Sequence, residues 1–119
     1  MRFTTEAQVW RYIQPQLRGL WRRIETVNVP GFPDVYGWPD ASGTTHFIEL
    51  KCGAPLDNSQ RAWLAAAWQR GVPAWILRGR ADRLDWYQDL EMKHPLLTPV
   101  FVLPAVPPRT RTRPLTSPT

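Results

Sequence analysis

Two short extended segments, joined by a turn-rich loop, constrain the fold more than any other part of this 119-residue sequence. Residues 34–38 and residues 45–51 have the composition of strands, and the Pro-Asp-Ala-Ser-Gly stretch between them is typical of a hairpin loop. A Pro-Gly-Phe-Pro turn precedes the first segment, and Glu-Leu-Lys ends the second. The sequence therefore predicts a hairpin that brings Asp34 alongside Glu49 and Lys51.

Strand parity predicts where these three side chains point. Alternate side chains of a strand share a face, so Glu49 and Lys51 should point one way while Ile48 and Leu50 point into the opposite layer. Two carboxylates and one ammonium group would then converge on one patch. The alternative interpretation is ordinary: Asp34 is a turn residue, and Glu49 and Lys51 form an exposed pair of small energetic value.

The three side chains would have a definite chemical use. Mg²⁺ prefers hard oxygen ligands, so the carboxylates of Asp34 and Glu49, with the backbone carbonyl of Leu50, would make an open metal site. A metal held there polarises a phosphodiester and lowers the pKa of a bound water, while Lys51 orients that water or stabilises the developing charge. The hypothesis is in-line attack of water at phosphorus, with Mg²⁺ as the cofactor and Mn²⁺ as a substitute.

The N-terminal part of the chain predicts a helix followed by a strand. Residues 4–20 carry apolar side chains at helical spacing, and Pro15 should kink this helix or divide it into two. Residues 21–29 contain several β-branched side chains and predict the first strand.

A second helix is predicted after the hairpin. Asn58 or Ser59 would cap it, and it would end near Arg70, where Gly71 terminates it. Three further elements are expected: a buried strand over residues 74–77, a helix over residues 81–90, and a last strand or extended segment over residues 99–103.

The order helix, three strands, helix, strand predicts an α/β (α+β) fold with a mixed central sheet flanked by helices. Residues 1–103 are expected to form one domain. From residue 104 onward Pro, Arg, Thr and Ser dominate and the apolar content falls, so residues 104–119 are expected to be a disordered basic tail.

Charge and composition indicate the class of partner. The net charge of +5 and the pI of about 10.1 make nucleic acid the first candidate. The single cysteine excludes an internal disulfide and a cysteine-based zinc site, and neither a long apolar run nor a signal peptide is visible, so we expect a cytoplasmic protein without membrane contact. The predicted phosphate contacts are Arg18, Arg22, Arg23, Arg109, Arg111 and Arg113, with Arg61, Arg70, Arg78 and Arg80 as an extension of that surface.

A resemblance to a known group of proteins adds to this interpretation. Residues 33–34 (Pro-Asp) followed by residues 49–51 (Glu-Leu-Lys) resemble the signature of the PD-(D/E)XK nuclease superfamily, and the likeness covers about residues 4–77. The wider pattern is similar to the small phage-type VRR-NUC and Holliday junction resolvase-like branch; it comprises residues 23–25, residues 31–34, residues 47–51 and Gln60. The resemblance implies a restriction-endonuclease-like core with the same order of elements.

The resemblance also implies a role for each site residue. Asp34 and Glu49 would be metal ligands and Lys51 the catalytic lysine. Gln60 matches a polar position that would help to hold the attacking water, the lysine or the scissile phosphate. The family often adds an upstream glutamate: Glu6 is favoured by its place on the first helix and Glu25 by its motif context, and the sequence does not decide between them.

The resulting hypothesis is a Mg²⁺-dependent DNA endonuclease of phage or prophage type, acting on branched or unpaired DNA in the cytoplasm of a bacterial host. With no domain that reads bases, sequence specificity would have to come from elsewhere. We expect DNA as the partner, a homodimer because cutting two strands needs two sites, and no small-molecule cofactor. The alternatives are a non-catalytic nucleic-acid-binding protein or accessory subunit that retains the fold, and a small basic scaffold protein that acts through its tail.

Overall fold

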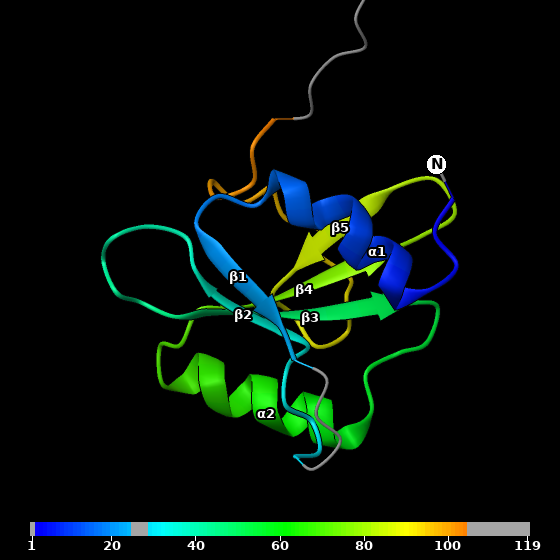
Figure 1. The fold of residues 1–119 in the computed structure, drawn as a ribbon. Helices are drawn as coiled ribbons and strands as arrows, with labels where there is room; N and C mark the ends of the chain where they lie inside the picture. Colours follow the sequence, from blue (N-terminus) through cyan, green and yellow to red (C-terminus); the bar gives the residue numbers. More distant parts are fainter. Residues whose placement is uncertain (1, 25–28, 105–119) are drawn as a thin grey trace, which may run out of the picture.

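A computed structural model describes residues 2–24 and 29–104 of the chain (Figure 1). The predicted order of helix, three strands, helix and strand is confirmed, with one more strand at its end. The elements are α1 (Glu6–Ile13), a 3₁₀ helix η1 (Gln14–Gln16), β1 (Leu20–Arg23), β2 (Val35–Trp38), β3 (His46–Cys52), α2 (Asn58–Gln69), β4 (Ala74–Gly79) and β5 (Leu84–Tyr87).

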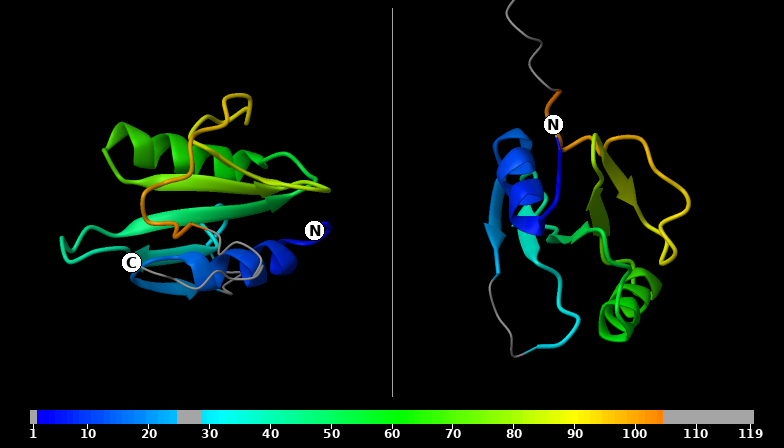
Figure 2. Two further views of the ribbon diagram at one scale, coloured as in Figure 1. Left: turned by 90° about the horizontal axis from the view of Figure 1, so that it is seen from above. Right: turned by 90° about the vertical axis from the view of Figure 1, so that its right-hand side faces the viewer.

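The five strands form one mixed sheet in the order β1-β2-β3-β4-β5. Neighbouring strands are antiparallel except β3 and β4, which are parallel and are therefore connected by a crossover that contains α2. Figure 2 shows α1 and α2 on opposite faces of the sheet. The predicted mixed sheet flanked by helices is confirmed. Within the described residues, no helix is long and apolar enough to cross a membrane.

Local chemistry explains both ends of the divided first helix. The Thr5 hydroxyl accepts a hydrogen bond from the Gln8 backbone N–H, and the Gln8 side chain reaches back to the Thr5 N–H, which makes a capping box. Pro15 lies in η1, where the α-helix has given way to a 3₁₀ turn. The expected division at Pro15 is confirmed.

The N-cap of the second helix lies one residue before the first of the two predicted cap residues. Asp57, and not Asn58 or Ser59, is the N-cap: its carboxylate accepts the Gln60 N–H at 2.8 Å, and the Gln60 side-chain oxygen accepts the Asp57 N–H at 2.9 Å. This capping box matters for function because it fixes Gln60 at the third position of α2.

The prediction of a helix over residues 81–90 is wrong. Residues 84–87 form β5, which pairs antiparallel with β4. Trp86 and Tyr87 are both buried on opposite faces of the sheet, one in each core cluster, so strand alternation buries two aromatic rings that one face of a helix would not. Residues 99–103 are extended and turn-like, with an isolated bridge between Leu17 and Val102.

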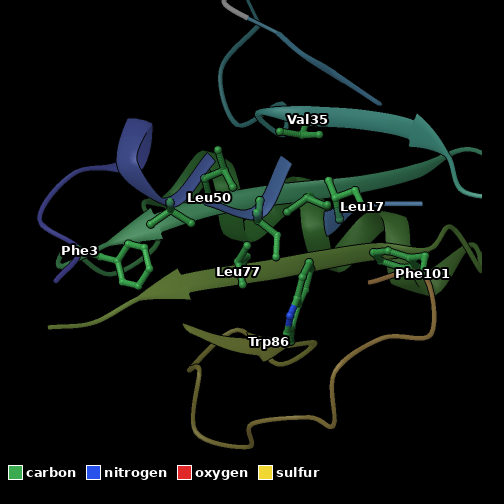
Figure 3. Packing of buried hydrophobic residues seen from close by; sticks show 10 residues of the cluster. Phe3, Leu17, Val35, Leu50, Leu77, Trp86 and Phe101 are labelled. Atoms are coloured by element: carbon green, nitrogen blue, oxygen red, sulfur yellow. The ribbon is translucent and has the colours of Figure 1, made fainter. Parts of the chain in front are cut away.

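Two hydrophobic clusters lie on the two faces of the sheet, here called the α1-face core and the α2-face core. Figure 3 shows residues of the α1-face core packed between α1 and the strands. The α1-face core comprises Phe3, Val9, Ile13, Leu17, Val35, Ile48, Leu50, Leu77, Trp86 and Phe101. The α2-face core comprises Leu56, Leu64, Ala67, Ala74, Ile76, Tyr87 and Met92.

Candidate active site

The predicted hairpin brings the two carboxylates together. Val35 pairs with Ile48 in the antiparallel register of β2 and β3, so the residue before Val35 stands beside the residue after Ile48. These two residues are Asp34 and Glu49. The Oδ2 atom of Asp34 accepts a hydrogen bond from the backbone N–H of Leu50 at 2.8 Å, which ties the start of β2 to the middle of β3.

The turn before Asp34 is anchored on the first turn of α2. Gly31 has a φ of +81°, and a Cβ built there would lie 2.2 Å from the carbonyl oxygen of Ser59. Only glycine permits this backbone conformation and close approach at low cost. The ring of Phe32 packs edge-on against Phe47 and Trp63, with centroids 5.8 and 5.5 Å away. The turn is therefore held between the sheet and α2, and it positions Asp34.

The predicted strand parity is confirmed. Ile48 and Leu50 are completely buried in the α1-face core, whereas Glu49 and Lys51 point to the face that carries α2. Both charged side chains are nearly inaccessible, with 2% exposure for Glu49 and 6% for Lys51. The exposed ion pair of the alternative interpretation is therefore excluded.

Gln60 connects the two buried charges. Its Nε2 atom donates to Oε2 of Glu49 at 2.8 Å, and its Oε1 atom lies 3.5 Å from Nζ of Lys51. The same Oε1 atom accepts the Asp57 N–H, so the helix cap holds the amide in this orientation. The structure thus brings Asp34, Glu49, Lys51 and Gln60 into one cluster.

Burial raises the pKa of both carboxyl groups. Burial, followed by the charge of Asp34 and a hydrogen bond to it, raises the pKa of Glu49 to about 9. Burial also raises the pKa of Asp34, although the Leu50 N–H and the hydrogen bond from Glu49 oppose this shift. A buried carboxyl group beside a second negative charge ionises less readily, so the protonated form of Glu49 is favoured near neutral pH.

Glu6 interacts electrostatically with Asp34 and Lys51 of this cluster. Burial raises its pKa first and the charge of Asp34 raises it further, while Lys51 and Arg23 lower it. Within residues 2–24 and 29–104, however, no three Asp, Glu, His or Cys side chains gather in a way that could hold a metal ion. Glu25 lies outside the described residues. The upstream glutamate that would complete the site therefore stays a prediction.

Comparison with known protein families assigns the chain to one of them. The model of the VRR-NUC domain family matches residues 6–81. This chain belongs to the VRR-NUC family. The match confirms the resemblance to the PD-(D/E)XK nucleases and makes this domain a nuclease domain.

The chain was also compared with curated proteins and with solved structures. No curated protein matches the VRR-NUC chain. Among solved structures, the Holliday junction resolvase Hjc of Archaeoglobus fulgidus is similar, with a TM-score of 0.47 and 14% sequence identity over 69% of this chain and 71% of that chain.

The described donors of the VRR-NUC site fit a hard divalent cation. Asp34 and Glu49 offer carboxylate oxygens, and the negative charge of Asp34 helps to raise the pKa of Glu49, a repulsion that a bound cation would relieve. The N–H and C=O groups of one strand residue point to the same side, so the carbonyl of Leu50 faces the same edge as its N–H, which is bonded to Asp34. Oxygen donors of this kind suit Mg²⁺ or Mn²⁺.

The predicted arginine contacts are only partly placed. Arg22 and Arg23 are neighbours in β1 and point to opposite faces, so they do not form one patch. Arg18 is exposed just before that strand. Arg109, Arg111 and Arg113 lie outside the described residues. DNA contact by these side chains stays a prediction.

Sequence reasoning missed Asp57 as the residue that orients Gln60. The signal was present, because Asp57 stands three residues before Gln60 and acid-x-x-Gln at a helix start is the capping-box pattern. Asn58 and Ser59 are also residue types that commonly cap helices, so residue preference alone did not single out Asp57 as the N-cap.

Proposed function

We propose that this VRR-NUC protein is a metal-dependent endonuclease that hydrolyses DNA phosphodiesters with Mg²⁺, for which Mn²⁺ substitutes. One observation carries the proposal: the hairpin places Asp34 beside Glu49, and Gln60 links Glu49 to a lysine that is itself nearly inaccessible. Burying these charges is unfavourable for folding, and they have an evident use only in chemistry.

The ligand groups have separate tasks. Asp34 and Glu49, with the carbonyl of Leu50, would hold the metal ion, which when bound supplies polarisation of the phosphodiester and a water of lowered pKa. Because burial raises the pKa of Glu49, metal binding there would compete with protonation of this carboxyl group. The Gln60 amide engages one oxygen of Glu49, which leaves the other oxygen for the metal. The Leu50 N–H holds Asp34 in place.

Lys51 would act on the reacting phosphate. Its ammonium group has three donors, and Gln60 accepts at most one of them. The remaining donors can orient the attacking water or stabilise the charge that develops on the phosphoryl oxygens. Burial strengthens this stabilisation, because the effective dielectric constant around Lys51 is lower than that of water.

The finer features of the function belong to the same proposal. The net charge of +5 favours a polyanion, and we propose that the DNA is branched or unpaired. A homodimer would supply the two sites that cleavage of both strands requires. A phage or prophage origin and action in a bacterial cytoplasm are the setting that we propose.

The test is cleavage by purified protein of a branched junction, a linear duplex and a single strand, with Mg²⁺, Mn²⁺ or EDTA. Lys51→Ala should lower the single-turnover rate by about 10²–10³-fold. The matched control is Lys93→Ala, which removes the only other lysine, an exposed one, and should leave the rate unchanged.

Three results would overturn the proposal. Cleavage in EDTA would exclude the metal-dependent mechanism. Full activity of Lys51→Ala would exclude the role of this lysine. Binding of DNA without cleavage in both Mg²⁺ and Mn²⁺ would favour a non-catalytic nucleic-acid-binding protein. Thermal unfolding of each variant shows whether a lost activity reflects a lost fold.

A further inference from the structure

A row of charged residues crosses three strands beside the proposed site. Lys51 of β3 is the register partner of Arg78 in β4, and Arg78 is the register partner of Asp85 in β5. Paired residues on neighbouring strands project from the same face of a sheet. Arg78 therefore lies on the face that carries Glu49 and Lys51, one strand away from the lysine.

Asp85 does not neutralise Arg78, although the two are opposite each other. The Oδ2 atom of Asp85 lies 3.2 Å from Nε of Arg80 and 3.0 Å from Nε of Arg83. These two arginines occupy the carboxylate. In the part of the chain that the structure describes, Arg78 makes no ion pair within 4.0 Å.

The guanidinium of Arg78 is poorly satisfied. Its Nε atom is buried and has no hydrogen-bond partner among the described residues, and its Nη2 atom makes one long contact, 3.4 Å, to the carbonyl oxygen of Gly53. A buried donor without a partner is unfavourable, and a second cation beside Lys51 adds repulsion. An anionic ligand would relieve both effects.

Space for such a ligand exists next to Arg78. The contact to Gly53 shows that the guanidinium reaches the loop that follows β3. A Cβ built on Gly53 would meet nothing within 4 Å, so this loop borders open space. An extended anion that reaches Lys51 can therefore continue past Arg78.

We propose that Arg78 is a second phosphate-binding residue, which holds the backbone phosphate adjacent to the scissile one on the cleaved strand. This inference rests on the proposed function. Adjacent parallel strands are about 4.8 Å apart, so Arg78 reaches a phosphate displaced from the one at Lys51. The guanidinium edge with the unpartnered Nε suits a two-point contact to phosphate oxygens, which a lysine cannot reproduce. Its role is to bind and place the strand, so it is a positioning residue.

The experiment combines Arg78 variants with DNA that carries one neutral phosphate. A single methylphosphonate replaces the scissile phosphate or each of its neighbours in turn, and KM and kcat are measured for the cleavable substrates, with binding measured for all of them. Arg78→Ala should raise KM about 10- to 100-fold with a smaller change in kcat. Arg78→Lys should recover only part of the loss.

The decisive result is coupling at one position. A methylphosphonate on one phosphate adjoining the scissile one should weaken binding by the wild-type protein as much as Arg78→Ala does, and should weaken the variant no further. The matched control is Arg11→Ala, which removes the same charge at an exposed position of α1, on the opposite face of the sheet (Figure 2), and should show no coupling at any phosphate.

The outcomes separate this inference from the function on which it rests. A wild-type protein that cleaves no substrate overturns both. Cleavage with equal losses for Arg78→Ala and Arg11→Ala, or with the same loss at every phosphate, overturns the inference alone. Coupling confined to the scissile phosphate also overturns it, because Arg78 would then act on the reacting group. If thermal unfolding shows that Arg78→Ala is not folded, Arg78→Lys carries the same test.

Discussion

The two faces of β3 bury side chains of different kinds. On one face Ile48 and Leu50 lie in the α1-face core, which is closed by apolar and aromatic side chains (Figure 3). On the other face Phe47 packs against the α2-face core, but Glu49 and Lys51 replace apolar side chains further along the same strand. One strand therefore supports a dry core on one side and buried charges on the other.

The difference shows that the buried polar side chains of the site need hydrogen-bond partners, whereas the apolar side chains of the other face do not. The α1-face core is stabilised by burial of apolar surface, which is favourable at every position. Glu49 and Lys51 are tolerated because Gln60 donates to Glu49 and accepts from Lys51, while the neighbouring Asp34 is held by the Leu50 N–H. We expect substitutions on the α1 face to reduce stability with little effect on the chemistry. Substitutions of the charged pair should do the reverse.

Glu49→Gln gives the largest expected effect and the sharpest form of the comparison. Loss of the proposed ligand should lower the cleavage rate by about 10³-fold or more. The metal-free protein should become more stable to urea near neutral pH. A neutral amide at this buried position has no negative charge to be repelled by Asp34. Glu91→Gln, an exposed member of the ion pair with Arg61, is the control and should change neither property by much. A loss of both activity and stability in Glu49→Gln would contradict the comparison.

Ile48→Ala tests the other face of the same strand. Removal of this fully buried side chain should lower the free energy of unfolding by about 2–5 kcal/mol, because it leaves a cavity in the α1-face core. The cleavage rate of the folded protein should stay near that of the wild type. Urea unfolding measures the first effect and single-turnover cleavage the second. Leu97→Ala, at a position 92% exposed, is the control, and Ile48→Val is a milder variant if the alanine protein is not folded.

Metal removal and pH should act together on the charged face. The pKa of Glu49 is about 9 in the folded protein against an ordinary value near 4.5, so the folded state binds more protons between these values. The contribution of Glu49 to stability is therefore full below pH 4.5 and is lost as the pH rises towards 9. Mg²⁺ at 100 times its dissociation constant should restore about 2.7 kcal/mol at pH 8.

Thermal unfolding with Mg²⁺ or EDTA measures this effect. The stabilisation by Mg²⁺ should be smaller at pH 5, where Glu49 is protonated, and should be absent in Glu49→Gln. An equal shift in wild type and Glu49→Gln would show that the metal binds elsewhere.

The smallest expected effect concerns His46, a titratable residue of the α1 face. Its ring stacks on Trp75, and Nδ1 accepts the Trp75 indole N–H at 3.2 Å. Burial lowers the pKa of His46, with a weaker opposing effect from Asp40. The unfolded chain is therefore protonated first, and stability is full above pH 6.5 and is lost as the pH falls through the lowered pKa.

The two faces should thus respond to acid in opposite directions. Urea unfolding of wild type and His46→Gln between pH 7.5 and 5.5 measures the part that belongs to His46, and His94→Gln is the exposed control. A pH dependence that is identical in wild type and His46→Gln would remove His46 from the comparison.

Most of the architecture could be predicted because the signals are local. The hairpin follows from its turn residues, and the separation of Glu49 and Lys51 from Ile48 and Leu50 follows from the two-residue repeat of a strand. Pro15 interrupts the first helix because proline lacks a backbone N–H and has a fixed φ. These features need no knowledge of distant residues.

The sequence by itself therefore determined the order of elements as far as β4, the hairpin, and the meeting of Asp34, Glu49, Lys51 and Gln60 in the candidate site. Only the tertiary structure decided that residues 84–87 are a strand, because pairing with β4 and burial on both faces outweigh a local helical pattern. It also decided that Asp57 orients Gln60, that burial raises the pKa of Glu49, and that Arg78 lacks the carboxylate opposite it. These properties depend on which groups meet across the fold, and burial amplifies each of them.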